Sequence, residues 1–203
     1  MRVAIVTAIL GAVLVASPNS QTTRDAVTSA SLERAFPQNG RIRMDLSAGD
    51  YHVSGGAANR IRVEWSVRDA DQLPKVRAVA DVRDHDATIT TDGPSNKGLK
   101  VTIQVPERSD LYVRLTAGDL RVEDIRGNKD IELHAGDARI DVGRPEDYHA
   151  VDASVWAGDI HAEPFQVIKD GLFRSFDWSG KGPYRLHAKL KAGDLRLYTK
   201  AAL

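Results

Sequence analysis

Five aspartates are the residues of this chain best placed to act together, because each follows a glycine inside the same short phrase. The phrase reads apolar, polar, Ala, Gly, Asp, apolar, polar, apolar, as in LTAGDLRV from Leu115 and LHAGDARI from Leu133. Carboxylates bind hard cations such as Ca²⁺, and they serve as acids and bases in hydrolysis. The five pairs are Gly49 and Asp50, Gly118 and Asp119, Gly136 and Asp137, Gly158 and Asp159, and Gly193 and Asp194.

The polar positions of the phrase form three charged columns if its copies stack in register. The first column is the five aspartates, the second is basic and the third is mostly acidic. We interpret this layout as a solvated face on which opposite charges offset each other, each exposed pair contributing at most about 1 kcal/mol. The second column comprises His52, Arg121, Arg139, His161 and Arg196, and the third Ser54, Glu123, Asp141, Glu163 and Tyr198.

Calcium binding by the aspartate column is the sharper alternative, because Ca²⁺ takes about six to eight oxygen ligands. The basic column beside it and the absence of the nine-residue glycine-rich calcium repeat argue against this alternative. Zinc is less suited still, since the six histidines form no His-x-His or His-x-x-x-His pair and the chain has no Cys. The sequence therefore predicts no metal site, and calcium is the one cofactor left as an alternative.

Catalytic motifs are also absent from the sequence. Without Cys there is no thiolate nucleophile, and no Gly-x-Ser-x-Gly motif positions a serine nucleophile. Extended β-helices that degrade polysaccharides use carboxylates with basic partners on their outer face. Here, however, the charges recur in every copy, whereas catalysis needs one distinct place. We therefore expect no enzyme, no catalytic residue and no cofactor-binding residue.

The phrase must lie across a bend between two strands. Apolar and polar residues alternate on each side of Gly-Asp, as in a strand with one buried face. The alternation changes parity across the pair, from Leu115 and Ala117 to Leu120 and Val122. The extra residue has to be absorbed by a bulge or corner, which glycine's conformational freedom and aspartate's hydrogen bonds to backbone amides make feasible.

Two strands joined by such a corner cannot bury their inner face alone, so the copies must stack on one another. Asp119 and Asp137 are 18 residues apart, which is roughly two strands and two turns. The predicted fold is all-β: a β-solenoid or β-roll of stacked strand-Gly-Asp-strand repeats in successive layers. Residues 61–106 alternate as strands without the phrase, which predicts an antiparallel N-terminal section.

Trp156 and residues 164–178 depart from the repeat. Residues 164–178 include Phe165, Phe176 and Trp178 among other apolar side chains, so we expect them to pack as a cap or flap over the stack. Trp156 takes an outward position that is polar in the other copies. An outward tryptophan suits contact with a sugar or a protein partner. The alternative is that residues 164–178 fold over it.

The chain begins with the pattern of a secretory signal. Arg2 precedes an apolar run from Val3 to Ala16, which is short for a bilayer span and typical of a signal peptide. We predict a signal peptide at 1–20, a tether at 21–35 with a short helix over its last five residues, and one domain at 36–203. After cleavage we expect no membrane span and an exported protein, in the periplasm, at the cell surface or secreted.

The charge balance bears on the partners. The 28 basic and 28 acidic residues give no net charge, so there is no electrostatic case for nucleic acid or for an anionic membrane surface. An envelope protein or a glycan is the partner that we expect.

A family resemblance rests on the strand LKVTIQVP from Leu99, which leads into LYVRLTAGDLRVEDIRG from Leu111, together with the signal and the recurring corners. In these features the chain resembles the putative-adhesin family of bacterial β-strand-repeat domains of unknown function. The resemblance covers roughly residues 36–203. It implies an envelope or secreted β-solenoid-like domain with no established activity and no catalytic residues to carry over.

Three hypotheses for function follow. The first is an exported, non-catalytic β-solenoid domain with an adhesin-like or scaffolding role in the bacterial cell envelope. The second is a ligand-binding or carbohydrate-binding protein, or even a carbohydrate-active one, with its site near Trp156 and residues 164–178. The third is self-association through the ends of the stack.

Overall fold

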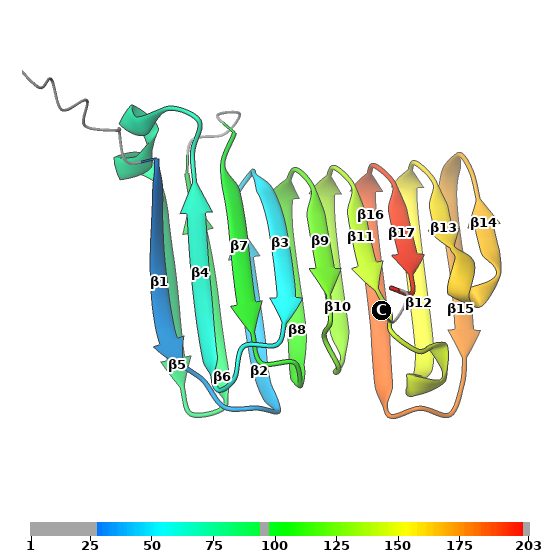
Figure 1. Cartoon of the computed structure of the whole chain (residues 1–203). Coiled ribbons are helices and arrows are strands. Elements are labelled where there is room, and N and C mark those ends of the chain that lie inside the picture. Colours follow the sequence, from blue (N-terminus) through cyan, green and yellow to red (C-terminus); the bar gives the residue numbers. More distant parts are fainter. Residues whose placement is uncertain (1–27, 94–97, 201–203) are drawn as a thin grey trace, which may run out of the picture.

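The chain is nearly all-β in the computed structural model, which describes residues 28–93 and 98–200. Two mixed sheets face each other, with three short 3-10 helices, η1 (Ala70–Lys75), η2 (Pro145–Asp147) and η3 (Glu163–Phe165), between strands (Figure 1). The nine-stranded sheet has the spatial order β1 (Ser29–Ala35), β4 (Arg60–Ser66), β7 (Lys100–Val105), β3 (Asp50–Gly55), β9 (Leu120–Glu123), β11 (Ala138–Asp141), β17 (Leu195–Tyr198), β13 (Ile160–Ala162) and β14 (Val167–Lys169). The eight-stranded sheet has the order β5 (Arg77–Arg83), β6 (Asp86–Asp92), β2 (Gly40–Leu46), β8 (Ser109–Ala117), β10 (Lys129–Ala135), β16 (Tyr184–Ala192), β12 (Tyr148–Ala157) and β15 (Leu172–Ser179).

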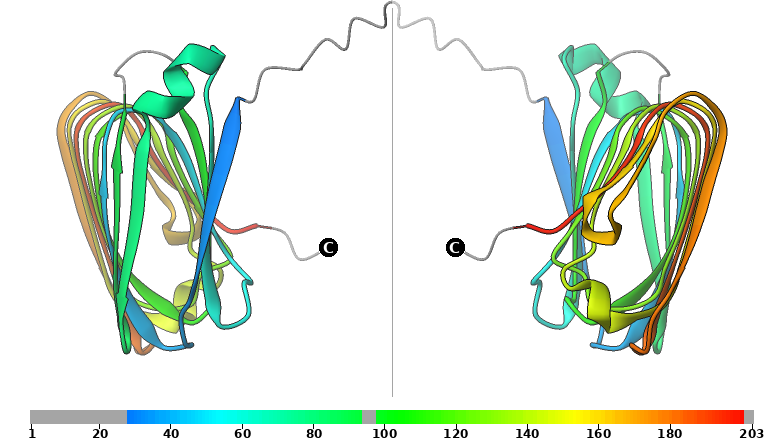
Figure 2. Two further views of the ribbon diagram at one scale, coloured as in Figure 1. Left: turned by 90° about the vertical axis from the view of Figure 1, so that its left-hand side faces the viewer. Right: turned by 90° about the vertical axis from the view of Figure 1, so that its right-hand side faces the viewer.

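Each Gly-Asp pair connects a strand of the eight-stranded sheet to the next strand of the nine-stranded sheet. We call such a pair of consecutive strands a layer. Layers β2/β3, β8/β9, β10/β11, β16/β17 and β12/β13 stack with parallel pairing in both sheets. Their spatial order differs from the chain order, because the last copy, β16/β17, lies between the third and the fourth. Figure 2 shows the stack from each end, with the bends of the layers one behind another.

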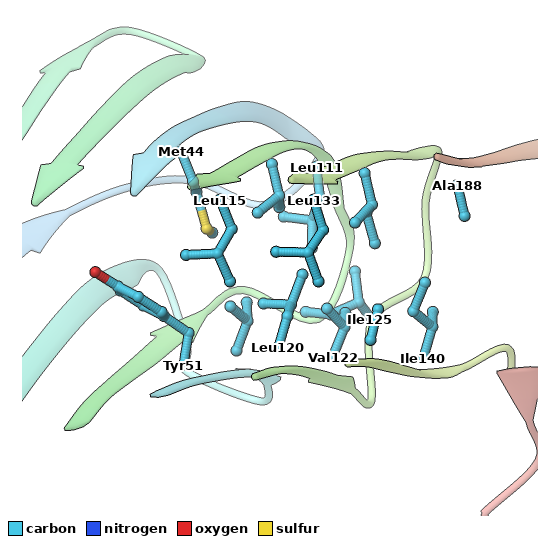
Figure 3. Packing of buried hydrophobic residues seen from close by; sticks show 14 of the residues in the cluster. Met44, Tyr51, Leu111, Leu115, Leu120, Val122, Ile125, Leu133, Ile140 and Ala188 are labelled. Carbon is cyan, nitrogen blue, oxygen red and sulfur yellow. The ribbon is translucent and has the colours of Figure 1, made fainter. Parts of the chain in front are cut away.

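Alternation of side chains fills the space between the sheets. The inward positions of β8, Leu111, Val113 and Leu115, are buried, and β10 places Leu133 beside Leu115 in register. Leu120 faces them from the other sheet, and Figure 3 shows these side chains interdigitating with those of neighbouring layers. Equivalent positions of successive layers thus form apolar rows along the stack, and the hydrophobic core runs its whole length.

Glycine at the corners is required by backbone conformation and by space. The φ angles of Gly118, Gly136, Gly158 and Gly193 are 108°, 120°, 139° and 120°. A Cβ atom on Gly136 would lie 2.2 Å from the carbonyl oxygen of Gly118 in the next layer, closer than real contacts come. Gly49 at the first corner differs, since it lies outside the left-handed region and its Cβ would meet the Leu99 oxygen at 3.1 Å.

The N-terminal end of the stack is antiparallel. Strand β4 pairs antiparallel with β7, β1 with β4, and β5 with β6. Strands β6 and β7 themselves pair parallel with β2 and β3, so they form a further layer that lacks the Gly-Asp phrase. The short helix expected over residues 31–35 is wrong: these residues belong to β1, because Leu32 packs against the core and the backbone pairs with β4.

Residues 164–178 cap the other end of the stack, as expected, but as strands that extend both sheets and not as a flap. Strand β14 adds antiparallel to β13 in one sheet, and β15 adds antiparallel to β12 in the other. Phe165, Phe176 and Trp178 pack together at the end of the core, with ring centroids of Phe165 and Trp178 5.1 Å apart. The segment therefore closes the core as a last layer of reversed chain direction, since paired strands satisfy backbone groups that a flap would leave open.

The predicted signal peptide, 1–20, and residues 21–27 of the predicted tether lie outside the described residues. In the part that the structure describes, no helix is long and apolar enough to cross a membrane.

Replacement of Gly136 tests the corner geometry. We expect Gly136→Ala to lower the free energy of unfolding by about 2–4 kcal/mol, because the new Cβ is forced against the Gly118 carbonyl at a φ that L-residues avoid. Urea denaturation of the purified protein measures this loss. The matched control is Gly49→Ala, for which we expect a loss below about 1 kcal/mol. Equal losses in the two variants would contradict the corner assignment.

Candidate functional site

The aspartate column holds the layers together. The backbone N–H of Asp137 donates to Asp119 Oδ1 at 3.4 Å, that of Asp194 to Asp137 Oδ1 at 3.0 Å, and that of Asp159 to Asp194 Oδ1 at 2.9 Å. Gly171 of the last layer continues the series, donating to Asp159 Oδ1 at 2.9 Å. Asp50, at the start of β3, stands apart: its N–H donates to the Leu99 carbonyl. Four of the five carboxylates thus serve the architecture.

The basic column is aligned across the nine-stranded sheet, in the order His52, Arg121, Arg139, Arg196 and His161. The third column is less regular. Ser54 pairs with Glu123 and Asp141 pairs with Tyr198, whereas Glu163 begins η3 and reaches Arg196 at 3.6 Å. Asp141 is buried and accepts the backbone N–H groups of Gly143 and Lys200, so it is no part of a solvated face.

Glu123 is the centre of the tightest polar cluster on this sheet. Its Oε2 atom lies 2.9 Å from His52 Nε2, and its Oε1 atom accepts the Tyr198 hydroxyl at 2.7 Å. Arg121 Nε lies 3.2 Å from the same Oε1. Three different strands, β3, β9 and β17, bring these groups together, because parallel layers align equivalent positions.

The chemistry of this cluster is that of a satisfied ion pair. Burial alone would raise the pKa of Glu123, but hydrogen bonds from Tyr198 and His52 and the charge of Arg121 outweigh it and lower the pKa. Burial and the bond to Glu123 raise the pKa of Tyr198 to about 12. At neutral pH the carboxylate is therefore ionised with both oxygens engaged, and the phenol keeps its proton.

Replacement of Glu123 tests this network. Folding lowers the pKa of Glu123, so its ionised carboxylate stabilises the protein at every pH above the pKa that it has in the unfolded chain. This contribution is lost as the pH falls below about 4. We expect Glu123→Gln to reduce the free energy of unfolding at pH 7 by about 1–2 kcal/mol and to flatten its decline towards acid. Urea denaturation at pH 7 and pH 3.5 measures both effects. If Glu123→Gln lowered the free energy of unfolding by the same amount at pH 7 and at pH 3.5, the assigned role would be contradicted.

Two groups of three side chains bring metal-ligating atoms within 4.8 Å of one another among the described residues: Asp130, Glu132 and His187, and Asp159, His161 and Asp170. In the first group Arg114 already binds both carboxylates, at 3.1 and 3.2 Å. In the second group Asp159 and His161 are partly buried and Asp170 is exposed, and one oxygen of Asp159 accepts the Gly171 amide. The absence of a metal site stays a prediction, with calcium binding by the aspartate column as its alternative.

Lys129 is a charged side chain inside the core. It takes an inward position of β10 between Leu111 and Leu186 and is 1% exposed. Its Nζ atom donates to the Ile125 carbonyl at 2.8 Å and to the Tyr148 hydroxyl at 2.7 Å. Burial lowers the pKa of Lys129 to about 8, although the charges of nearby aspartates, Asp141 foremost, oppose the shift.

The pH dependence of stability tests the state of Lys129. Between pH 8 and 10.5 the unfolded chain keeps a proton that the folded amine releases, so the free energy of unfolding rises with pH, by up to about 3 kcal/mol. We expect Lys129→Met to abolish this rise between pH 8 and pH 9.5, measured by urea denaturation. Lys75→Met, which changes an exposed lysine, is the control. A rise that persists in Lys129→Met contradicts this interpretation.

Trp156 lies on the outer face of the eight-stranded sheet, 58% exposed. The alternative that residues 164–178 fold over it is wrong, since they extend the sheet beside it. Phe173 of β15 is its neighbour, 72% exposed, with ring centroids 6.0 Å apart and planes inclined by 45°. Ser154, Lys189 and Lys191 line a hollow of about 470 Å³ with these two rings.

Sequence reasoning missed Lys129; it placed residues 164–178 near Trp156 but did not single out Phe173. Lys129 stands two and four positions before Ile131 and Leu133, so the three side chains share one face of the strand. This period-two spacing could have shown that Lys129 faces inward. No local signal marks Phe173 as the neighbour of Trp156, because the pairing of β15 with β12 spans a turn through the other sheet.

Comparison with known proteins supports the fold. No protein-family model matches the chain, and no curated protein matches it in sequence. A solved structure described as a putative cell adhesion protein from Clostridium sporogenes is 14% identical over 85% of this chain and 100% of its own, with a TM-score of 0.56. Structures described as putative adhesins from Parabacteroides merdae (13% identity, TM-score 0.31, 85% and 92% covered) and Parabacteroides distasonis (14%, 0.30, 84% and 97%) are less similar. The first likeness is one of fold: the chain shares the architecture of that cell adhesion structure.

Proposed function

We propose that this chain is an exported, non-catalytic β-solenoid domain with an adhesin-like or scaffolding role in the bacterial cell envelope. The observation that carries the proposal is the use of the repeated aspartates. Their carboxylates accept backbone N–H groups of the adjacent layer, so the most regular acidic groups of the chain serve its architecture. A stack held in this way offers two broad, rigid sheet faces for contact with a partner.

Two further observations support the proposal. The chain shares its fold with the Clostridium sporogenes structure described as a putative cell adhesion protein, which is an argument by analogy of fold. The apolar run from Val3 to Ala16 favours export. The partner would be an envelope protein or a glycan, and the outer edges of β1, β5, β14 and β15 could also support self-association.

The second candidate is a ligand-binding or carbohydrate-binding protein. It is favoured by the exposed pair Trp156 and Phe173 on the outer face of the last layers. Large aromatic side chains left in water beside each other are costly, and they are typical of surfaces that bind a partner.

Retention by envelope polymers tests the proposed function. We expect the purified protein to sediment with isolated cell-envelope fractions in a saturable manner, and the polysaccharides in these fractions to gain no reducing ends over hours. Release of reducing ends that stops in Glu123→Gln would show catalysis and overturn the non-catalytic assignment. If the protein sediments with none of the envelope fractions, an adhesin-like role is contradicted.

A further inference from the structure

The face around Trp156 combines two exposed rings with cations that form no ion pair among the described residues, although Arg174 Nε donates to the Asp170 carbonyl. Lys189, Lys191 and Arg174 line the same hollow as Trp156 and Phe173. None of these three cations makes an ion pair within residues 28–93 and 98–200, whereas Arg114 and Arg185 on the same sheet are paired with carboxylates. The chain carries no net charge, so this grouping is a local concentration of positive charge.

The strand register creates this grouping. Ser154 of β12 lies between Ser175 of β15 and Lys189 of β16. One outward position further along β12, Trp156 lies beside Lys191 of β16, because Val155 pairs with Leu190 and Ala157 with Ala192. The rings thus lie towards the end of the stack on β12 and β15, Ser154 and Ser175 lie one outward position away on the same strands, and the lysines lie on the adjacent strand β16.

No acidic side chain is among the described residues that line the hollow. Glu132, the neighbour of Lys189 on β10, is held by Arg114 at 3.2 Å. The ammonium groups of Lys189 and Lys191 are therefore available to an external anion, and an anion bound here meets no opposing carboxylate.

The backbone conformation of Phe173 also indicates a binding site on this face. Its φ angle is 55°, a left-handed conformation that a bulky residue rarely adopts. Conformations of this kind persist where the surroundings hold them, and they gather at binding sites. Here the conformation brings the ring beside Trp156 on the outer face.

We propose that this face binds an acidic polysaccharide, a chain of sugars that carry carboxylates. The proposal rests on the second candidate function and specifies its ligand. The ring faces of Trp156 and Phe173 carry negative charge density, which attracts the C–H groups on the apolar side of a sugar. Lys189 and Lys191 would bind the carboxylates, and Ser154 can donate to sugar hydroxyls. The hollow of about 470 Å³ has the usual size of a small-ligand site.

The position of the surface favours a glycan over an acidic peptide. A peptide would gain main-chain hydrogen bonds at the free edge of β15, but the rings lie on the face of the sheet. The backbones of β12 and β16 are already paired with each other there. An elongated ligand that uses rings, hydroxyls and charges, and needs no main-chain partner, fits this face better.

Matched neutral and acidic polymers test the proposal. We expect the purified full chain to bind polygalacturonate saturably in isothermal titration calorimetry, and its fully methyl-esterified form at least about tenfold more weakly, because esterification removes the carboxylate charges. Trp156→Ala and the double variant Lys189→Gln with Lys191→Gln should each weaken binding by about tenfold or more. Raising NaCl to about 0.5 M should weaken binding by the parent protein more than by the double variant.

Two controls make the result specific. Ile168→Ala removes an exposed apolar side chain, 64% exposed, from the other sheet and should leave binding unchanged. The thermal unfolding midpoint of each variant must match that of the parent protein, so that a loss of binding can be assigned to the altered surface and not to unfolding. Trp156→Tyr, which keeps a ring, should retain most of the affinity.

Four outcomes would overturn the proposal: equal binding of the esterified polymer, equal loss in Ile168→Ala, tighter binding to poly-glutamate, or binding only to vesicles with anionic lipids. If polygalacturonate does not bind but envelope fractions still retain the protein, this inference fails and the adhesin-like role stands. If reducing ends are released, the non-catalytic role fails and the ligand class stands.

Discussion

The close approach of one layer's backbone to the next at the glycine corners is the constraint on which the whole stack depends. The N–H of Gly118 donates to the Ala135 carbonyl and that of Gly136 to the Ala192 carbonyl, both at 2.9 Å. At the same place the Cα of each glycine faces the carbonyl of another glycine. Any side chain there would hold the layers apart, and the inward rows of Leu, Ile and Val would lose contact together.

This constraint assigns most of the repeated polar groups to the architecture. At four of the five corners the aspartate after the glycine has its carboxylate directed along the stack, where it accepts an amide of the next layer. The side chains two and four positions further along project from strands and are aligned by the same register, which brings Glu123 between His52 and Tyr198. Regular charge on the nine-stranded sheet is thus a consequence of stacking, and it needs no ligand to explain it.

The strands and corners could be predicted from the sequence because their signals are local: period-two alternation and a parity change at Gly-Asp. The order of the layers could not, since the phrase from Leu190 is equivalent to the others and nothing in it specifies a place between β10/β11 and β12/β13. Residues 164–178 were harder still. Their aromatic density predicts burial at the end of the core, but antiparallel pairing with β12 and β13 depends on contacts distant in sequence.

Departures from the repeat are therefore more informative about function than the repeat itself. Inside the core the departure is Lys129, whose ammonium replaces an apolar side chain and is satisfied by Ile125 and Tyr148, a local solution that adds no surface. On the outside the departure is Trp156, which replaces a polar residue and stays exposed. It lies in the last parallel layer, where the reversed strand β15 supplies Phe173 in place of another copy of the phrase. A repeat protein can acquire a specific site near its end without disturbing its stack, because the reversed strand β15 that supplies Phe173 pairs with one strand only.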